Sequence, residues 1–140
     1  MLPLIDTHQH LWDLSRLELP WTGGIPQLNR SFLMSDYLQA TEGQKVSKTV
    51  YMEVDVHPDH RQREVEIISE ICSDASNPMQ AAVFCAEPGG VDFEPFLENN
   101  QNNPWIRGLR KVLHNPDIPK GACLKPVSYT HLRAHETRTY

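Results

Sequence analysis

Two histidines lie one residue apart near the start of the chain, in the segment IDTHQH. A neutral imidazole can bind a metal ion, accept a hydrogen bond or exchange a proton near neutral pH. His8 and His10 could therefore form half of a metal site, belong to a hydrolytic site without a metal, or be ordinary loop histidines. An H-x-H pair by itself does not decide among these three interpretations.

The residues around the pair predict a short strand that begins at Leu4 and runs to about His8. Because alternate side chains of a strand point to the same face, we expect Asp6, His8 and His10 on one face and Gln9 on the other. Three polar groups on one face are costly in a dry core unless they are paired. They fit the carboxyl ends of parallel strands, where active sites form. Two imidazoles there could both reach a Zn²⁺ ion.

Three further side chains are candidates for a substrate site. Glu53 is expected on the same strand face as Thr49 and Tyr51, where it either lines the site or forms a structural ion pair. Arg110 has a planar fork that suits a carboxylate or another oxygen atom of a substrate, and the alternative is an interior salt bridge with Glu53. Trp12 either forms a wall of the pocket or packs in the core.

The other histidines have simpler explanations. His57 and His60 flank the predicted start of a helix, and we expect them to face solvent. His114 follows the last predicted strand, where a role in a turn is as reasonable as one in the site. His131 and His135 have a spacing that would place them on one helix face, but they lie in a C-terminal segment that does not continue the pattern of the domain.

Strands and helices alternate along the chain. The pattern predicts strands near residues 4–8, 46–56, 80–85 and 106–113, and helices near residues 36–44, 60–75 and 93–98, with Ser35 and Asp92 as caps. Residues 12–30 are expected to be irregular because prolines and glycines interrupt them. Such alternation predicts a parallel sheet with crossover helices, which is an α/β fold.

The composition excludes several classes of function. The 140 residues suit one domain, and 39% are hydrophobic, which is enough for a core. The net charge is −5 and the lysines and arginines are scattered, which argues against a nucleic-acid surface. No apolar run is long enough for a membrane span. The first residues do not show the basic and apolar regions of a secretory signal, so we expect none. We expect a cytoplasmic protein whose cysteines, Cys72, Cys85 and Cys123, are reduced and buried.

The segment IDTHQHLW resembles the first strand of the amidohydrolase superfamily. It is most similar to the amidohydrolase-related branch, which includes sugar lactonases and the pyrone-dicarboxylate lactonase. Further similar segments are PQLNRSFLMSDY, at the entry to the first helix, and GLRKVLH on the fourth strand, where Arg110 matches an arginine common in this branch. The resemblance covers about residues 2–118 and rests mainly on D-x-H-x-H-x-W.

This resemblance implies a TIM (β/α)8 barrel in which the first-strand H-x-H binds a metal or, in some lactonases, contacts the substrate without one. In the family, histidines of the fifth and sixth strands complete the site, and an aspartate of the eighth acts as general base toward the hydrolytic water. Only His8 and His10 carry over to this chain. Because a barrel needs about 250 residues and eight strands, the expected fold is its N-terminal half, β/α units 1–4.

Three functions remain open. The first is a hydrolase that opens a lactone or ester in a sugar-derived or carboxylated small molecule, helped by a metal or by histidine and arginine. The second is a metal-dependent decarboxylase, which shares the H-x-H start in this superfamily. The third is a fragment without catalysis, which either has no function or binds a metal passively. For the two enzymes the expected partner is a small-molecule substrate, and the chain alone is expected to be inactive.

The end of the chain does not continue the pattern. VSYTHLRAHET resembles translated adapter or vector sequence, and residues 128–140 have Leu132 as their one aliphatic residue besides alanine. We therefore expect residues 1–126 to be the partial barrel domain and residues 127–140 to be a non-native tail. The half barrel is expected to leave its first and fourth strands as unpaired edges and to be marginally stable alone.

Overall fold

The computed structural model describes residues 2–113. Four strands form one sheet in chain order, and every neighbouring pair is parallel: β1 (Leu4–Gln9), β2 (Val46–Met52), β3 (Met79–Cys85) and β4 (Ile106–Arg110). The predicted α/β class and strand order are therefore confirmed. His114, Cys123 and the C-terminal segment with His131 and His135 lie outside the described residues.

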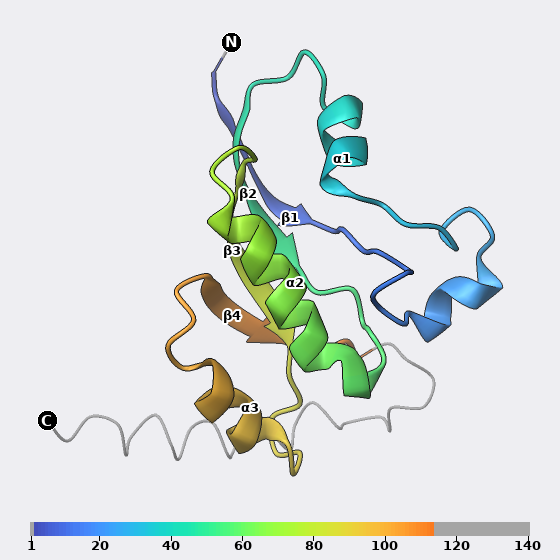
Figure 1. Ribbon diagram of the computed structural model, residues 1–140, viewed down its shortest axis with the longest axis vertical. Helices are drawn as coiled ribbons and strands as arrows, with labels where there is room; N and C mark the ends of the chain where they lie inside the picture. The colour runs from blue at the N-terminus through green and yellow to red at the C-terminus, as the bar shows by residue number, and fades with distance from the viewer. Residues whose placement is uncertain (1, 114–140) are drawn as a thin grey trace, which may run out of the picture.

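Three α-helices and two short 3-10 helices connect the strands. Their bounds are η1 (Pro20–Gly24), α1 (Met34–Ala40), η2 (Pro58–His60), α2 (Arg61–Ser73) and α3 (Phe93–Asn100). Figure 1 shows α2 lying lengthwise against the sheet, and the segment around η1 extending away from it beyond the end of β1. Within residues 2–113, no helix is long and apolar enough to cross a bilayer.

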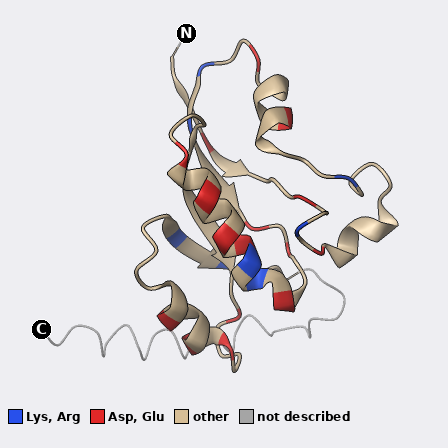
Figure 2. Ribbon diagram, viewed as in Figure 1, with Lys and Arg blue, Asp and Glu red and all other residues tan. Residues whose placement is uncertain are grey.

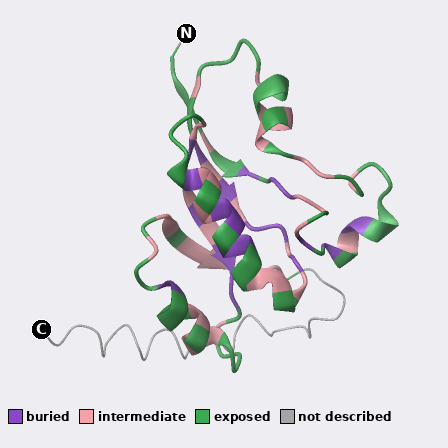
Figure 3. Ribbon diagram, viewed as in Figure 1, coloured by how far each residue is buried: buried purple, intermediate pink, exposed green. Residues whose placement is uncertain are grey.

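The sequence pattern of α2 explains why this helix covers the sheet. Val65, Ile68 and Cys72 recur at three- and four-residue spacing, and all three are buried. Acidic and basic residues occupy the outer surface of the helix (Figure 2), where exposed residues alternate with buried ones (Figure 3). Beneath it, Tyr51 of β2 and Phe84 of β3 have no exposed surface, and their ring centroids are 6.0 Å apart.

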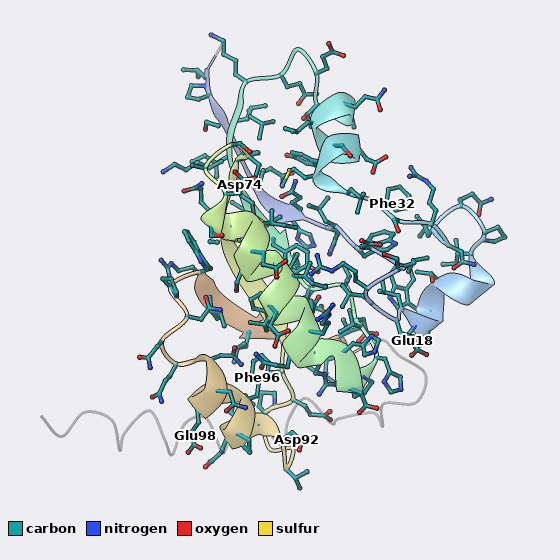
Figure 4. The ribbon with its side chains drawn as sticks, in the orientation of Figure 1. Glu18, Phe32, Asp74, Asp92, Phe96 and Glu98 are labelled. Atoms are coloured by element: carbon teal, nitrogen blue, oxygen red, sulfur yellow. The ribbon has the colours of Figure 1, made fainter. Side chains whose placement is uncertain are left out.

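Side chains outside the sheet and α2 also pack against the core. Phe96 of α3 and Phe32 before α1 pack against the buried cluster (Figure 4). Between β1 and β2, the Thr49 hydroxyl donates to Gln9 Oε1 at 2.6 Å, so that this buried polar pair is satisfied. Cys72 and Cys85 are buried free thiols, as the sequence predicts for them.

Element boundaries differ from the predicted ones where local hydrogen bonds replace a pattern. The first helix begins at Met34 and ends at Ala40, and its cap is not Ser35: the Asp36 carboxylate accepts the Leu33 N–H at 2.7 Å. β2 ends at Met52, four residues before the expected end, and β4 ends at Arg110 rather than Leu113. Apolar residues continue after both strands, at Val54 and Val56 and at Val112 and Leu113, but the chain has left the sheet and forms loops.

Candidate functional site

The two histidines lie side by side at the end of β1. The His8 and His10 rings meet edge to face, with centroids 4.8 Å apart. Asp6 is not on their face, so the predicted alternation is wrong here. The Tyr37 hydroxyl of α1 donates to Asp6 Oδ2 at 2.8 Å, and Gln9 also reaches α1. The physical reason is a shift in the pairing with β2 between Asp6 and Gln9, which breaks the two-residue period.

Hydrogen bonding defines the tautomer of His10. Its Nδ1 lies 2.9 Å from the Met52 carbonyl oxygen, which can only accept, so Nδ1 carries the hydrogen and Nε2 keeps its lone pair. Desolvation lowers the pKa of His10 below 6.5, against the Met52 hydrogen bond, and the positive charge of Arg110 lowers it further. His10 is therefore a neutral imidazole at neutral pH, with Nε2 able to accept a proton or bind a metal.

A pocket of about 620 Å³ opens at the carboxyl ends of the strands. Its polar side chains are those of His10, Glu53, Asp55 and Arg110, and its apolar ones are those of Trp12, Trp21, Ile25, Leu28, Val54 and Val112. Four of the five predicted site residues therefore meet at one cavity, and His8 lies beside His10 outside the lining. This volume is typical of a pocket for a small molecule.

Arg110 and Glu53 form an ion pair in this pocket. The Arg110 Nε–H donates to Glu53 Oε1, and the Asp55 N–H donates to Glu53 Oε2 at 2.7 Å. The Glu53 side chain has no exposed surface, whereas 36% of the Arg110 side chain is exposed. The ion pair is the structural alternative that the sequence allowed. β2 ends at Met52, so Glu53 directly follows the strand that carries Thr49 and Tyr51, and all three side chains are buried.

Two indoles form one wall of the pocket. Trp12 and Trp21 pack edge to face, with ring centroids 5.8 Å apart. The Trp12 Nε1–H donates to the Arg30 carbonyl at 2.7 Å, and the Trp21 Nε1–H donates to the Val54 carbonyl at 2.8 Å. Trp12 is 8% exposed, so it both packs in the core and lines the pocket. Sequence reasoning missed Trp21, Ile25 and Leu28 because the irregular segment has no period that could place them.

A buried carboxyl group of α2 supports the loop after β2. Glu64 Oε1 accepts the Tyr51 hydroxyl at 2.8 Å and the Val54 N–H at 3.2 Å. The Tyr51 hydroxyl also lies 3.3 Å from the Leu11 carbonyl oxygen, next to His10. Desolvation raises the pKa of Glu64 to about 7, although both hydrogen bonds oppose the rise. Glu64 thus connects the segments that carry His10 and Glu53.

His57 and His60 do not simply face solvent, as the sequence suggests. Both are half-buried, and both accept backbone hydrogen bonds at Nδ1. His57 accepts the Asp59 N–H at 3.3 Å, and His60 accepts the Glu18 N–H at 2.8 Å. These bonds fix the start of η2 and join it to the segment before η1, so the two histidines have a structural role.

Two groups of side chains can be compared with the needs of a metal ion. Ligand atoms of Glu53, Asp55 and Cys85 lie within 4.8 Å of one another. Arg110 already neutralises Glu53, however, and burial raises the pKa of the Cys85 thiol to about 11, so this group does not fit a resident cation. His8 and His10 fit by donor type, but residues 2–113 bring no third His, Cys, Asp or Glu to them, and a catalytic zinc takes three.

The fold is that of the N-terminal half of a TIM barrel: four parallel strands with alternating helices and a pocket at the carboxyl ends. The structure is similar to Amidohydrolase 2 from Bifidobacterium longum subsp. infantis, with 26% identity and a TM-score of 0.66 over 96% of this chain and 48% of that chain. It also matches an amidohydrolase from Burkholderia multivorans, with 18% identity and a TM-score of 0.64 over 94% of this chain and 46% of that one.

Comparisons of the sequence with known proteins give weaker support than the comparisons of the structure. No protein-family model matches the chain. The uncharacterized protein y4mH of Sinorhizobium fredii is 24% identical over 122 residues, which are 81% of this chain and 41% of that protein. The chain therefore spans less than half the length of each of these relatives. The similarity supports an amidohydrolase-like half barrel.

Proposed function

We propose that this chain forms the first half of a barrel hydrolase that opens a lactone or ester bond in a small molecule. The observation that carries the proposal is the meeting of His10 and Arg110 at one pocket beyond the strand ends. The likeness to amidohydrolase structures supports the same reaction class. The pocket volume fits a small molecule.

The reaction adds water across an acyl carbon–oxygen bond. The water oxygen attacks the carbonyl carbon, the ring C–O bond breaks, and the proton that water loses is returned to the leaving alkoxide, which gives a hydroxy acid. Arg110 donates N–H groups to the carbonyl oxygen as negative charge develops on it. Residues 2–113 offer no hydrogen-bond partner to the terminal nitrogens of its guanidinium, so these remain available. Neutral His10 can hold the water through Nε2.

When a divalent metal such as zinc is bound, we propose that His8 and His10 hold it. His10 Nε2 then binds the metal in place of the water, because Nδ1 is used by the Met52 carbonyl. A third protein ligand would have to come from outside residues 2–113. Zinc would polarise the substrate carbonyl when bound. We also propose a cytoplasmic location, which the buried free thiols of Cys72 and Cys85 support, because reduced cysteines persist in that compartment.

The test is a lactonase assay on the full-length protein that carries this segment. A panel of five- and six-membered lactones is followed by acid release, with and without added zinc. We expect turnover, and a loss of about 100-fold or more in kcat/KM for His10→Ala and for Arg110→Met. Val91→Ala, at a position that is 91% exposed and outside the pocket, is the control and should change nothing. Absence of turnover across the panel would contradict the proposal.

A further inference from the structure

The pocket has two sides of different chemistry. His10, Glu53 and Arg110 face it from the strand ends, whereas Trp21, Ile25 and Leu28 face it from the segment around η1. This segment extends beyond the end of β1 (Figure 1), so it can contact a ligand without taking part in the sheet. The apolar side is therefore separate in the chain from the residues proposed to do chemistry.

Among residues 2–113, the apolar side has no free side-chain hydrogen-bonding group. Each indole N–H is already used, that of Trp12 by the Arg30 carbonyl and that of Trp21 by the Val54 carbonyl. Ile25 and Leu28 have none to offer, and Ile25 is still 40% exposed. A ligand hydroxyl placed here would lose its hydrogen bonds to water and gain no replacement. A hydrocarbon group placed here would cover exposed apolar surface instead.

The polar side offers donors to oxygen atoms. Arg110 keeps its terminal N–H groups for a ligand, because Glu53 takes only Nε among the described contacts. Glu53 cancels the charge of Arg110, and Asp55 adds a carboxylate to the lining, so the pocket does not concentrate positive charge. This side therefore suits the carbonyl and ring oxygens of a neutral lactone or ester.

We propose that the pocket selects a lactone or ester with a hydrocarbon substituent, in preference to a polyhydroxylated sugar lactone, and that Trp21, Ile25 and Leu28 determine this specificity. The inference rests on the proposed function, because it names the substrate class of the same site. It decides between the sugar-derived and the non-sugar substrates that the reaction class leaves open.

Three six-membered lactones test the proposal on the full-length protein: δ-valerolactone, δ-nonalactone with an alkyl chain, and D-glucono-δ-lactone with hydroxyl groups. Binding is followed by tryptophan fluorescence and turnover by acid release. We expect δ-nonalactone to bind about tenfold or more tightly than δ-valerolactone, and glucono-δ-lactone to bind more weakly than both. Tighter binding of glucono-δ-lactone than of δ-nonalactone would overturn the inference.

Single substitutions test whether the apolar side of the pocket causes the preference for δ-nonalactone. Ile25→Gln should weaken δ-nonalactone binding by about tenfold and leave δ-valerolactone binding unchanged, since Ile25 is partly exposed and its replacement keeps the fold. Val91→Gln is the matched control, also apolar and exposed but outside this pocket. Equal losses for both lactones would contradict a role in specificity. Binding of δ-nonalactone without turnover of any lactone would leave this inference standing and reject the proposed reaction.

Discussion

Val54 shows how single hydrogen bonds position the site. Its N–H is bound by Glu64 of α2, and its carbonyl oxygen is bound by the Trp21 indole. The next residue, Asp55, has a φ of +50°, a backbone conformation that is uncommon outside glycine but that aspartate tolerates. The Asp55 N–H then donates to Glu53. The loop that carries Glu53 is therefore held at each successive peptide.

Glu64 should make the stability of the chain depend on pH. Its folded pKa of about 7 lies above the ordinary value of 4.5, so the folded state binds an extra proton between these pH values. The free energy of unfolding should consequently fall by roughly 3 kcal/mol as pH rises through this window, and stay low above it. Urea unfolding at pH 4.5, 6 and 8 measures this, and Glu64→Gln should remove the slope.

Glu66→Gln is the matched control for that experiment, because Glu66 is an exposed glutamate on the same helix. Its unfolding should keep the pH dependence of the parent chain. If Glu64→Gln shows the same slope as Glu66→Gln, ionisation of Glu64 is not the cause.

At the scale of elements, one ion pair joins the loop after β2 to the end of β4. Glu53 is fully buried, and its partner Arg110 is a little over one third exposed. Breaking such a pair from one side leaves a buried charge without compensation, which costs more than the intact pair contributes. The pair therefore matters for the order of the pocket as well as for the proposed chemistry.

Arg110→Met should lower the free energy of unfolding by about 2–3 kcal/mol, less than for a fully buried pair because Arg110 is partly exposed. The double variant Glu53→Gln with Arg110→Met should recover most of this loss, since no buried charge remains. Urea unfolding at pH 7 of the parent, the single variants and the double variant gives the coupling energy. Additive losses would show that the two side chains do not depend on each other.

The sequence predicts the elements better than it predicts their ends and the site. The apolar segments along the sequence predict each strand and α-helix of residues 2–113. Strands of a parallel sheet are buried on both faces, so they appear in the sequence as nearly continuous apolar runs. The pattern fails at Asp6, where a shift in strand pairing changes the face, and after Met52, where Val54 and Val56 stay apolar outside the sheet. Ile25 could not be predicted as a pocket residue, since a loop position has no period.

At the scale of the whole molecule, the sheet has two open edges among the described residues. β1 and β4 each pair on one side only, and Ile5 on β1 is 60% exposed. A strand edge with apolar side chains can pair with another chain. The two open edges agree with the expectation that a half barrel leaves its first and fourth strands unpaired on one side.

We therefore expect the 140-residue chain to associate as its concentration rises, and Ile5→Glu to reduce this. Glutamate would lie opposite Lys48 of β2, so it adds edge charge without repulsion inside the sheet. Sedimentation velocity over a range of concentrations measures the effect. Leu38→Glu is the matched control, because Leu38 is 46% exposed but belongs to α1 and not to an edge strand. Equal effects of the two variants would argue against pairing through β1.

The strand order β1-β2-β3-β4 also has a consequence for synthesis on the ribosome. Each strand pairs with the one that precedes it in the chain. A newly made β/α unit can thus join the sheet as soon as it leaves the exit tunnel, without waiting for distant sequence. The pocket forms late in this order, because Arg110 arrives only with the fourth strand, about 100 residues after His10.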